Sequence, residues 1–226
     1  MGNVTINILI QDSEIHMNKE ESETDINSKW EQIIKDKGAD FVYFVDITMF
    51  PKEVTGEYKC AILFGKSLSK EYIRDIKAGV EPKHKEIFNT EQKMDALALK
   101  VAEMLEAEGY KSVGKLKTGL LPHKSVALRV GIGFIGKNNL LVTPEYGCAQ
   151  MLGKVLTTAP FVTTYHESIA PQCGDCNICV DVCPNNALLG TTWDINKKRE
   201  DIITRKLCTL CVKCMANCPF TQKYIK

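Results

Sequence analysis

The sequence has 226 residues, of which 44% are hydrophobic and 25% are charged. This composition is typical of a folded protein with a sizeable core, and it excludes a disordered chain. The length suffices for one larger domain and a small module. The net charge of +1, from 29 Lys and Arg against 28 Asp and Glu, gives no overall attraction to nucleic acid or to an anionic membrane. The N-terminus has no secretion signal and no window approaches a membrane span, so we expect a cytoplasmic protein with no membrane partner.

The first 165 residues alternate between helical and strand patterns. After a polar stretch, Trp30, Ile33 and Ile34 recur at helical spacing and predict a helix that ends near Gly38. Short apolar runs at 41–45 and 60–64 are typical of buried strands in a covered sheet. Residues 85 to 109 predict a long amphipathic helix whose apolar side consists of Ile87, Phe88, Met94, Leu97, Val101, Met104 and Leu105. Short strands are expected at 139–143 and 151–157, which gives an α/β or α+β domain with a mixed sheet over residues 1–165.

A glycine-rich stretch within this domain, Gly131-Ile-Gly133-Phe-Ile-Gly136, matches the G-x-G-x-x-G pattern. The dinucleotide-binding fingerprint needs a strand before it and a long helix after it, whereas turn residues follow here within 12 positions. We therefore reject a dinucleotide site and expect a loop that lets another large ligand approach the backbone.

Eight of the ten cysteines lie between 173 and 218, in two copies of the run C-x2-C-x2-C-x3-C-P. This run is the bacterial ferredoxin signature for paired 4Fe-4S clusters, because three cysteines of a tight loop reach three iron corners and the fourth crosses to the other cluster. We predict that one cluster is held by Cys173, Cys176, Cys179 and Cys218. The second is then held by Cys208, Cys211, Cys214 and Cys183. Residues 166–226 are the predicted ferredoxin-like domain.

Zinc and disulfides are the alternatives for these cysteines. Zinc sites usually take their cysteines in pairs and have no use for a third one in each run, and disulfides suit secreted chains. Cys60, in an apolar segment, is expected to be a small core residue. Cys148 follows a turn, where its thiol either faces a pocket or, as we expect, is buried.

The stretch from Leu121 to Gly147, LPHKSVALRVGIGFIGKNNLLVTPEYG, followed by a paired-cluster module, closely resembles cobalamin-dependent epoxyqueuosine reductases and more distantly resembles reductive dehalogenases. The resemblance covers roughly residues 25 to 226. It implies that the N-terminal domain holds a cobalamin, whose cobalt the clusters reduce to a nucleophilic state that attacks the substrate. It also implies that the corrinoid is bordered by Arg129, Gly131, Gly133, Gly136, Lys137, Asn138 and Tyr146.

The sequence departs from that family in three ways. Lys117 precedes Thr118-Gly119 where the reductases carry a proton-donating acid, so Lys117 is the expected catalytic donor if its surroundings lower its pKa from about 10.4. The second cysteine run lacks the family's long insertion. The sequence given stops eight residues after Cys218, so the helical repeats that help those enzymes hold tRNA are not expected, and tRNA is not the expected substrate.

Two functions of different classes follow. In the first, the protein is an oxidoreductase that takes electrons from a low-potential donor such as ferredoxin or flavodoxin and passes them through two clusters to a cobalamin, where a small molecule is reduced. In the second, it is an electron-transfer or interaction protein with two clusters and no corrinoid. Fold resemblance alone does not separate them.

Overall fold

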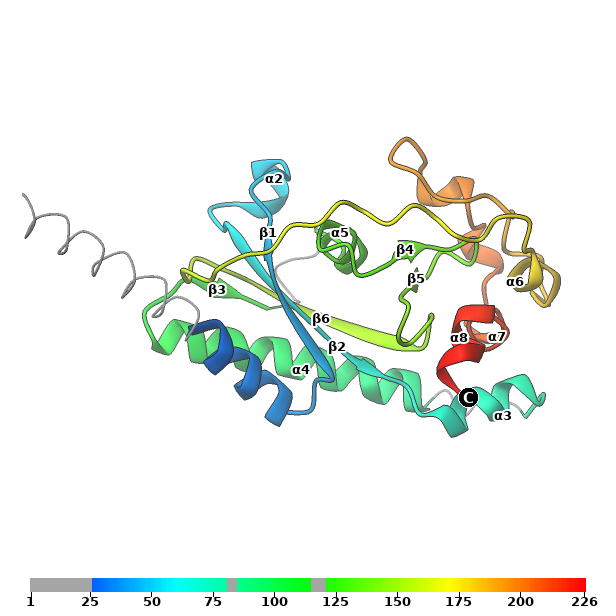
Figure 1. The fold of residues 1–226 in the computed structure, drawn as a ribbon, viewed down its shortest axis with the longest axis horizontal. Coiled ribbons are helices and arrows are strands. Elements are labelled where there is room, and N and C mark those ends of the chain that lie inside the picture. The colour runs from blue at the N-terminus through cyan, green and yellow to red at the C-terminus, as the bar shows by residue number, and fades with distance from the viewer. Residues whose placement is uncertain (1–25, 81–84, 115–120) are drawn as a thin grey trace, which may run out of the picture.

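The computed structural model describes residues 26–80, 85–114 and 121–226, and its centre is a four-stranded sheet (Figure 1). The strands lie in the order β1 (Phe41–Asp46), β2 (Cys60–Ser67), β6 (Gln150–Thr157) and β3 (Ser112–Val113), and each neighbouring pair is antiparallel. The predicted α/β or α+β class is confirmed. We expected a mixed sheet, but its strands are antiparallel, and the parallel pairing among the described residues is one bridge between Val45 and Thr164. The prediction missed this because apolar runs indicate which strands are buried but not which way they run.

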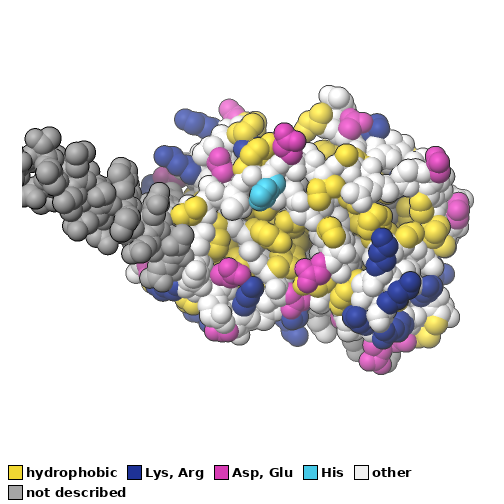
Figure 2. All heavy atoms as spheres, viewed as in Figure 1, with side chains coloured by type: hydrophobic (Ala, Val, Ile, Leu, Met, Phe, Trp, Pro, Cys, Tyr) yellow, Lys and Arg dark blue, Asp and Glu magenta, His cyan; other side chains and the backbone are white. Residues whose placement is uncertain are grey.

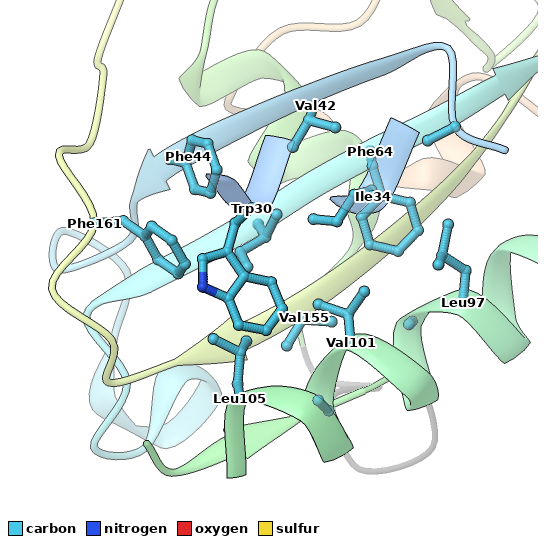
Figure 3. Close-up of a cluster of buried hydrophobic side chains, with 14 of the residues drawn as sticks. Trp30, Ile34, Val42, Phe44, Phe64, Leu97, Val101, Leu105, Val155 and Phe161 are labelled. Carbon is cyan, nitrogen blue, oxygen red and sulfur yellow. The ribbon is translucent and has the colours of Figure 1, made fainter. Parts of the chain in front are cut away.

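Two helices cover one face of this sheet. Residues 26–36 form the first, and α4 (Lys85–Ala107) is the second and longer one. The fully buried Trp30 lies between them and meets the ring of Phe161 edge to face, with 6.4 Å between ring centroids (Figure 3). The core on this face also contains Ile34, Phe44, Phe64, Leu97, Val101, Leu105 and Val155. Both predicted helices are confirmed, because their apolar residues recur with the helical period.

The N-terminal turn of α4 is less buried than the rest of its apolar side. Ile87 is only partly buried and Phe88 is 45% exposed, whereas Met94 and Leu97, further along the helix, are buried. The two residues line a cavity beyond the edge of the sheet. Helical periodicity places a side chain on a face of the helix, but not whether the sheet extends far enough to cover it.

The opposite face of the sheet is covered by α5 (His123–Arg129), which contacts β1, β2 and β6. Next comes a hairpin of β4 (Phe134–Ile135) and β5 (Leu141–Val142), while α2 (Lys52–Thr55) lies between β1 and β2 in the chain. The first six residues of β2 are buried, as expected of a strand covered on both faces. The glycine-rich stretch leads into this hairpin and not into a long helix, which agrees with the rejection of a dinucleotide fold.

Residues 158–172 cross the molecule without helix or strand, apart from the bridge at Thr164, and lead into the cysteine-rich part (Figure 1). The domain boundary expected at 165/166 falls in this segment. The cysteine-rich part contains the short helices α6 (Ile178–Asp181), α7 (Lys213–Ala216) and α8 (Pro219–Tyr224) and the 3-10 turns η2 (Arg199–Asp201) and η3 (Arg205–Leu207). An antiparallel bridge between Leu188 and Ile203 joins its two halves.

Helix α3 (Lys70–Lys77) connects the sheet to the cysteine-rich part by packing on α7. It begins at Ser69, whose hydroxyl oxygen accepts a hydrogen bond from the N–H of Tyr72, a favourable helix cap. Its apolar side shares one buried cluster with residues of both parts, among them Tyr72, Ile73, Ile76, Phe134, Met215 and Cys218. Within the described residues, no helix combines the length and apolar character needed to cross a bilayer.

Candidate iron-sulfur centre and neighbouring cavity

Cys173, Cys176 and Cys179 surround the turn that leads into α6, and Cys218 reaches them from the second run. Burial raises the pKa of the Cys173 thiol, and the nearby thiols of Cys218 and Cys176 raise it further. Burial also raises the pKa of Cys179 to about 11, and the nearby thiols of Cys173, Cys218 and Cys176 raise it further. The four cysteines predicted to hold one cluster therefore occupy one neighbourhood.

The other four cysteines, Cys183, Cys208, Cys211 and Cys214, all line a single cavity. Burial raises the pKa of Cys214 to about 12, and the neighbouring thiols of Cys179, Cys211 and Cys208 raise it further. Cys183 joins the group by packing with Cys208 and Cys214 against the same small apolar cluster. The influence of Cys179 on Cys214 places the two groups side by side, as paired clusters require.

The cysteines have the chemistry of cluster ligands. All ten are free thiols, so no disulfide competes for them. Among the described residues, no three His, Cys, Asp or Glu side chains converge closely enough to chelate a single metal ion. Each cysteine group supplies four thiols, and a cubane presents four separate iron corners to soft sulfur ligands.

Cys148 is buried, as expected, but it also forms part of the wall of the same cavity, and it lies against the predicted ligand Cys218. Its thiol donates to the sulfur of Cys218, and this bond, together with the backbone N–H groups of Phe220 and Thr221, lowers the pKa of Cys218. Asn138 Nδ2 donates to Cys148 Sγ across 3.2 Å, and the Cys148 N–H donates to Thr221 Oγ1 across 2.9 Å. A lowered pKa favours the thiolate, which is the form that binds metal. Sequence spacing could not reveal this contact, because Cys148 belongs to neither cysteine run.

Cys60, expected to be a core residue, is 3% exposed and lies in the helix-covered core. Burial raises the pKa of its thiol to about 12. Such a thiol is inert at neutral pH.

The glycine-rich loop lies against the cysteine-rich part. Lys137 is buried, and its ammonium group donates to the carbonyl of Gly174 across 2.9 Å and to Asn177 Oδ1 across 3.0 Å, both within the first cysteine run. A Cβ on Gly131 would lie 2.9 Å from the carbonyl oxygen of Glu167, and one on Gly133 would lie 2.1 Å from that of Val142. These glycines therefore permit close backbone packing.

Arg129, Gly136 and Tyr146 also have contacts within the protein. The Arg129 guanidinium lies 3.7 Å from the centre of the Tyr165 ring, and a Cβ on Gly136 would lie 2.8 Å from Asn138 Oδ1. Tyr146 stacks on Phe41 with 5.7 Å between ring centroids. Of the seven residues predicted to border a corrinoid, Asn138 lines the cavity, and the binding role of all seven stays a prediction. Lys117 lies outside the described residues.

The cavity beside the second cysteine group has a volume of about 520 Å³, within the range of ligand and cofactor sites. Its walls come from α4, α5, the residues after the glycine-rich loop, β6 and the cysteine-rich part. Apolar residues such as Ile87, Leu140, Met151 and Leu188 dominate the lining, while amides are provided by Asn138, Asn139 and Gln150.

Charged side chains also reach this cavity from different sides. Lys124 of α5 and Arg199 and Arg205 of the cysteine-rich part contribute cations, whereas Glu91 and Asp95 of α4 contribute carboxylates. Lys124 Nζ donates to the carbonyl and side-chain oxygens of Asn139 across 2.7 and 3.0 Å. Burial, followed by the charge of Arg199, lowers the pKa of Lys124 to about 8. No motif in the sequence indicated Lys124 or the two arginines, because the cavity forms only when distant segments pack.

Comparison with known families defines the class of the cysteine-rich part. Residues 172–221 match the 4Fe-4S dicluster domain family. This match covers the whole of both cysteine runs, so the C-terminal part is a 4Fe-4S dicluster domain with a ferredoxin-like arrangement.

The chain is similar in sequence to epoxyqueuosine reductases. It is 36% identical over 99 residues to that of Staphylococcus aureus (strain NCTC 8325 / PS 47), which covers 44% of this chain and 25% of the relative. It is also 36% identical over 120 residues to that of Listeria monocytogenes serovar 1/2a (strain ATCC BAA-679 / EGD-e), covering 46% and 31%. The matched region thus spans about a quarter to a third of these relatives' length.

Solved structures share the fold over more of the chain. A selenomethionine-labelled epoxyqueuosine reductase superposes with a TM-score of 0.62 and 18% identity, covering 88% of this chain and 66% of that one. An epoxyqueuosine reductase with an epoxyqueuosine-modified tRNA-Tyr stem loop superposes with a TM-score of 0.61 and 17% identity, covering 88% of this chain and 66% of that one. A reductive dehalogenase described as B12-dependent superposes with a TM-score of 0.53 and 18% identity, covering 66% of this chain and 24% of that one.

Proposed function

We propose that this protein is an iron-sulfur oxidoreductase that passes electrons through two 4Fe-4S clusters to a cobalamin in the neighbouring cavity, where a small-molecule substrate is reduced. The observation that carries the proposal is the position of the cavity, because all four cysteines of the second group form part of its wall. A redox cofactor in that cavity lies directly beside a cluster, as electron transfer requires.

The grouping of the cysteines in space supports the predicted ligand sets. Cys173, Cys176, Cys179 and Cys218 hold the first cluster, and Cys208, Cys211, Cys214 and Cys183 hold the second, so each fourth ligand crosses between the runs. The proximity of the Cys218 thiol helps to raise the pKa of both Cys173 and Cys179, which supports the crossing, since Cys218 is far from the other two in sequence.

The cavity residues fit a corrinoid in their chemistry. Apolar side chains exclude water from its faces, and the amides of Asn138 and Asn139 can bond to the amide groups at its rim. Lys124 holds Asn139 in place through two hydrogen bonds. A bound cobalamin supplies a strongly reducing, nucleophilic cobalt centre. Lys117 remains the predicted proton donor, and Lys117→Ala is expected to abolish turnover while leaving the iron content unchanged.

The relatives inform the choice of cofactor. The matched relatives are named epoxyqueuosine reductases, and one structural neighbour is described as B12-dependent. One related structure holds a modified tRNA stem loop. For this chain we propose a small molecule as substrate, and failure of a tRNA-Tyr stem loop to bind in a gel-shift assay is the expected result.

The test is retention of cobalamin after anaerobic purification and iron-sulfur reconstitution. After incubation with hydroxocobalamin and gel filtration, we expect a co-eluting corrinoid spectrum at about one equivalent per chain. Phe88→Glu should abolish retention without loss of iron, because Phe88 lines the cavity and is 45% exposed. Leu99→Glu is the matched control, since Leu99 lies on the same helix, is 40% exposed and does not line the cavity.

A second candidate function is electron transfer through two clusters without a corrinoid. It is favoured by the packing of the glycine-rich loop, since the six other residues predicted to border a corrinoid do not line the cavity. Full iron content with no retained cobalamin in the wild-type protein would select this function over the first.

A further inference from the structure

Exposed basic residues gather on one side of α3, α7 and α8. Figure 2 shows Lys and Arg side chains over the end of the molecule where Figure 1 places α3 and the C-terminus. The α3–α8 basic patch, as we call it, consists of the exposed residues Lys70, Arg74, Lys77, Lys213 and Lys223. The same three helices carry two carboxylates, Glu71 and Asp75. A chain with a net charge of only +1 is therefore locally basic here.

Contacts with α8 fix the position of these cations without neutralising them. The Lys70 ammonium lies 5.3 Å from the centre of the Tyr224 ring, and that of Lys223 lies 5.3 Å from the centre of the Phe220 ring. Arg74 and Lys77 donate to the carbonyl of Ile225 and the amide oxygen of Gln222.

Several lysines elsewhere are paired with carboxylates, for example Lys29 with Glu108 and Lys66 with Asp40. Within the described part of the chain, no member of the patch forms an ion pair. The charge of the patch is therefore available to an external anion.

The patch lies one helix away from the first cysteine group. The buried side of α3 packs in the same cluster as Cys218 and Cys173, while its exposed side carries Lys70, Arg74 and Lys77. Cys218 is also the residue from which α8 begins. A protein docked on the patch would thus approach the first cluster more closely than one docked at the α2 end of the sheet.

We propose that the α3–α8 basic patch is the docking surface for an acidic electron-donor protein. The proposal rests on the proposed function, because it needs a cluster on the first cysteine group. In each encounter the reduced donor gives up one electron and the first cluster accepts it, with no bond formed or broken. Complementary charge raises the rate of encounter about 10- to 1000-fold, and this gain is lost in high salt.

The test follows reduction of the reconstituted protein by a reduced, strongly acidic flavodoxin in a stopped-flow spectrometer. We expect the second-order rate constant of the wild-type protein to fall steeply between about 20 and 300 mM salt. The double variant Lys70→Glu with Lys223→Glu should react at least about 10-fold more slowly at low salt and lose most of the salt dependence. The control, Lys52→Glu with Lys59→Glu, changes two exposed lysines near α2, at the other end of the sheet, and should stay within about twofold of wild type.

Photoreduced deazaflavin, a small reductant that needs no docking surface, separates docking from the clusters themselves. The patch variant should accept electrons from deazaflavin as fast as the wild type, which would locate the defect in docking. Equal rates of reduction by flavodoxin for the patch variant and the control would overturn the docking proposal and leave the proposed function intact. A wild-type protein that deazaflavin cannot reduce would overturn both.

Discussion

The contact between Cys148 and Cys218 links the two parts of the chain at a predicted cluster ligand. Hydrogen bonds to ligand sulfurs stabilise the more negative, reduced state of a cluster and so raise its reduction potential. The Cys148 thiol makes such a bond, and Asn138 holds that thiol in place. Cys148 is therefore expected to be a positioning residue that tunes the first cluster.

Cys148→Ala should lower the reduction potential of one cluster and leave the other unchanged. A hydrogen bond worth about 1 kcal/mol corresponds to about 40 mV for one electron. A redox titration followed by paramagnetic resonance measures the shift, and Cys60→Ala, which removes another buried thiol away from the clusters, should cause none. Loss of iron from Cys148→Ala would instead identify Cys148 as a ligand.

Cys183→Ser tests the crossing of ligands between the runs. Cys183 belongs to the first run in sequence but packs with Cys208 and Cys214 of the second. We expect selective damage to the cluster held by Cys208, Cys211 and Cys214, seen as a changed site in the Mössbauer spectrum. Damage to the cluster of Cys173, Cys176 and Cys179 would contradict the pairing.

The burial of Lys124 makes the stability of the folded protein depend on pH. Burial lowers its pKa from the ordinary 10.5 to about 8, so between these values the unfolded chain binds more protons than the folded one. Stability from this residue therefore rises as pH increases from about 8 to 10.5. Urea unfolding should show that Lys124→Met stabilises the protein most at pH 8 and least near pH 10.5, whereas Lys100→Met, at an exposed site, gives no such trend.

The sequence predicts those residues of the site whose role follows from their spacing within one short motif. The two cysteine runs indicated which eight thiols gather in two groups, because the loop geometry of each run is local. Asn138, Cys148 and Lys124 acquire their positions from packing between distant segments. For that reason the resemblance to a family indicated Asn138 as a corrinoid-bordering residue but not its contact with Cys148, and no pattern indicated Lys124.

At the scale of elements, the turn before Cys148 determines how the sheet meets α8. Gly147 has a φ of +57°, and a Cβ there would lie 2.3 Å from the backbone nitrogen of Thr221. No side chain fits at this distance, so the turn can approach α8 only with glycine.

Gly147→Ala should therefore destabilise the protein by about 3 kcal/mol and lower its iron content, because α8 begins at the ligand Cys218. Gly109→Ala is a control with a similarly positive φ of +92° but no atom within 4 Å of the new Cβ. It should cost only about 1 kcal/mol through backbone strain. Equal changes in melting temperature for the two variants would contradict the role given to the turn.

The long helix and the apolar strands β1, β2, β5 and β6 were predictable, whereas two short helices and one short strand were not. The helix expected at 85–109 is α4, because six turns of apolar residues at a regular period leave little ambiguity. Helices α3 and α5, with eight and seven residues, are too short for periodicity to identify. Strand β3 has two residues and exists only through its pairing with β6.

At the scale of the whole molecule, the sheet part and the dicluster part share a buried cluster. Residues of α3, β4 and the turn at Cys148 pack in it with Cys218 and α7. The predicted division at 165/166 therefore separates the chain in sequence, while the packing joins the two parts around the first cysteine group. This arrangement places the cavity, the second cysteine group and the basic patch in one connected region.

Both proposals require two complete cubanes in each chain. Iron and acid-labile sulfide should be counted after anaerobic reconstitution of the purified protein. About eight iron and eight sulfide per chain are expected, because each of the two cysteine groups supplies four ligands. About four of each, or stoichiometric zinc in place of iron, would contradict the assignment of both cysteine groups to 4Fe-4S clusters.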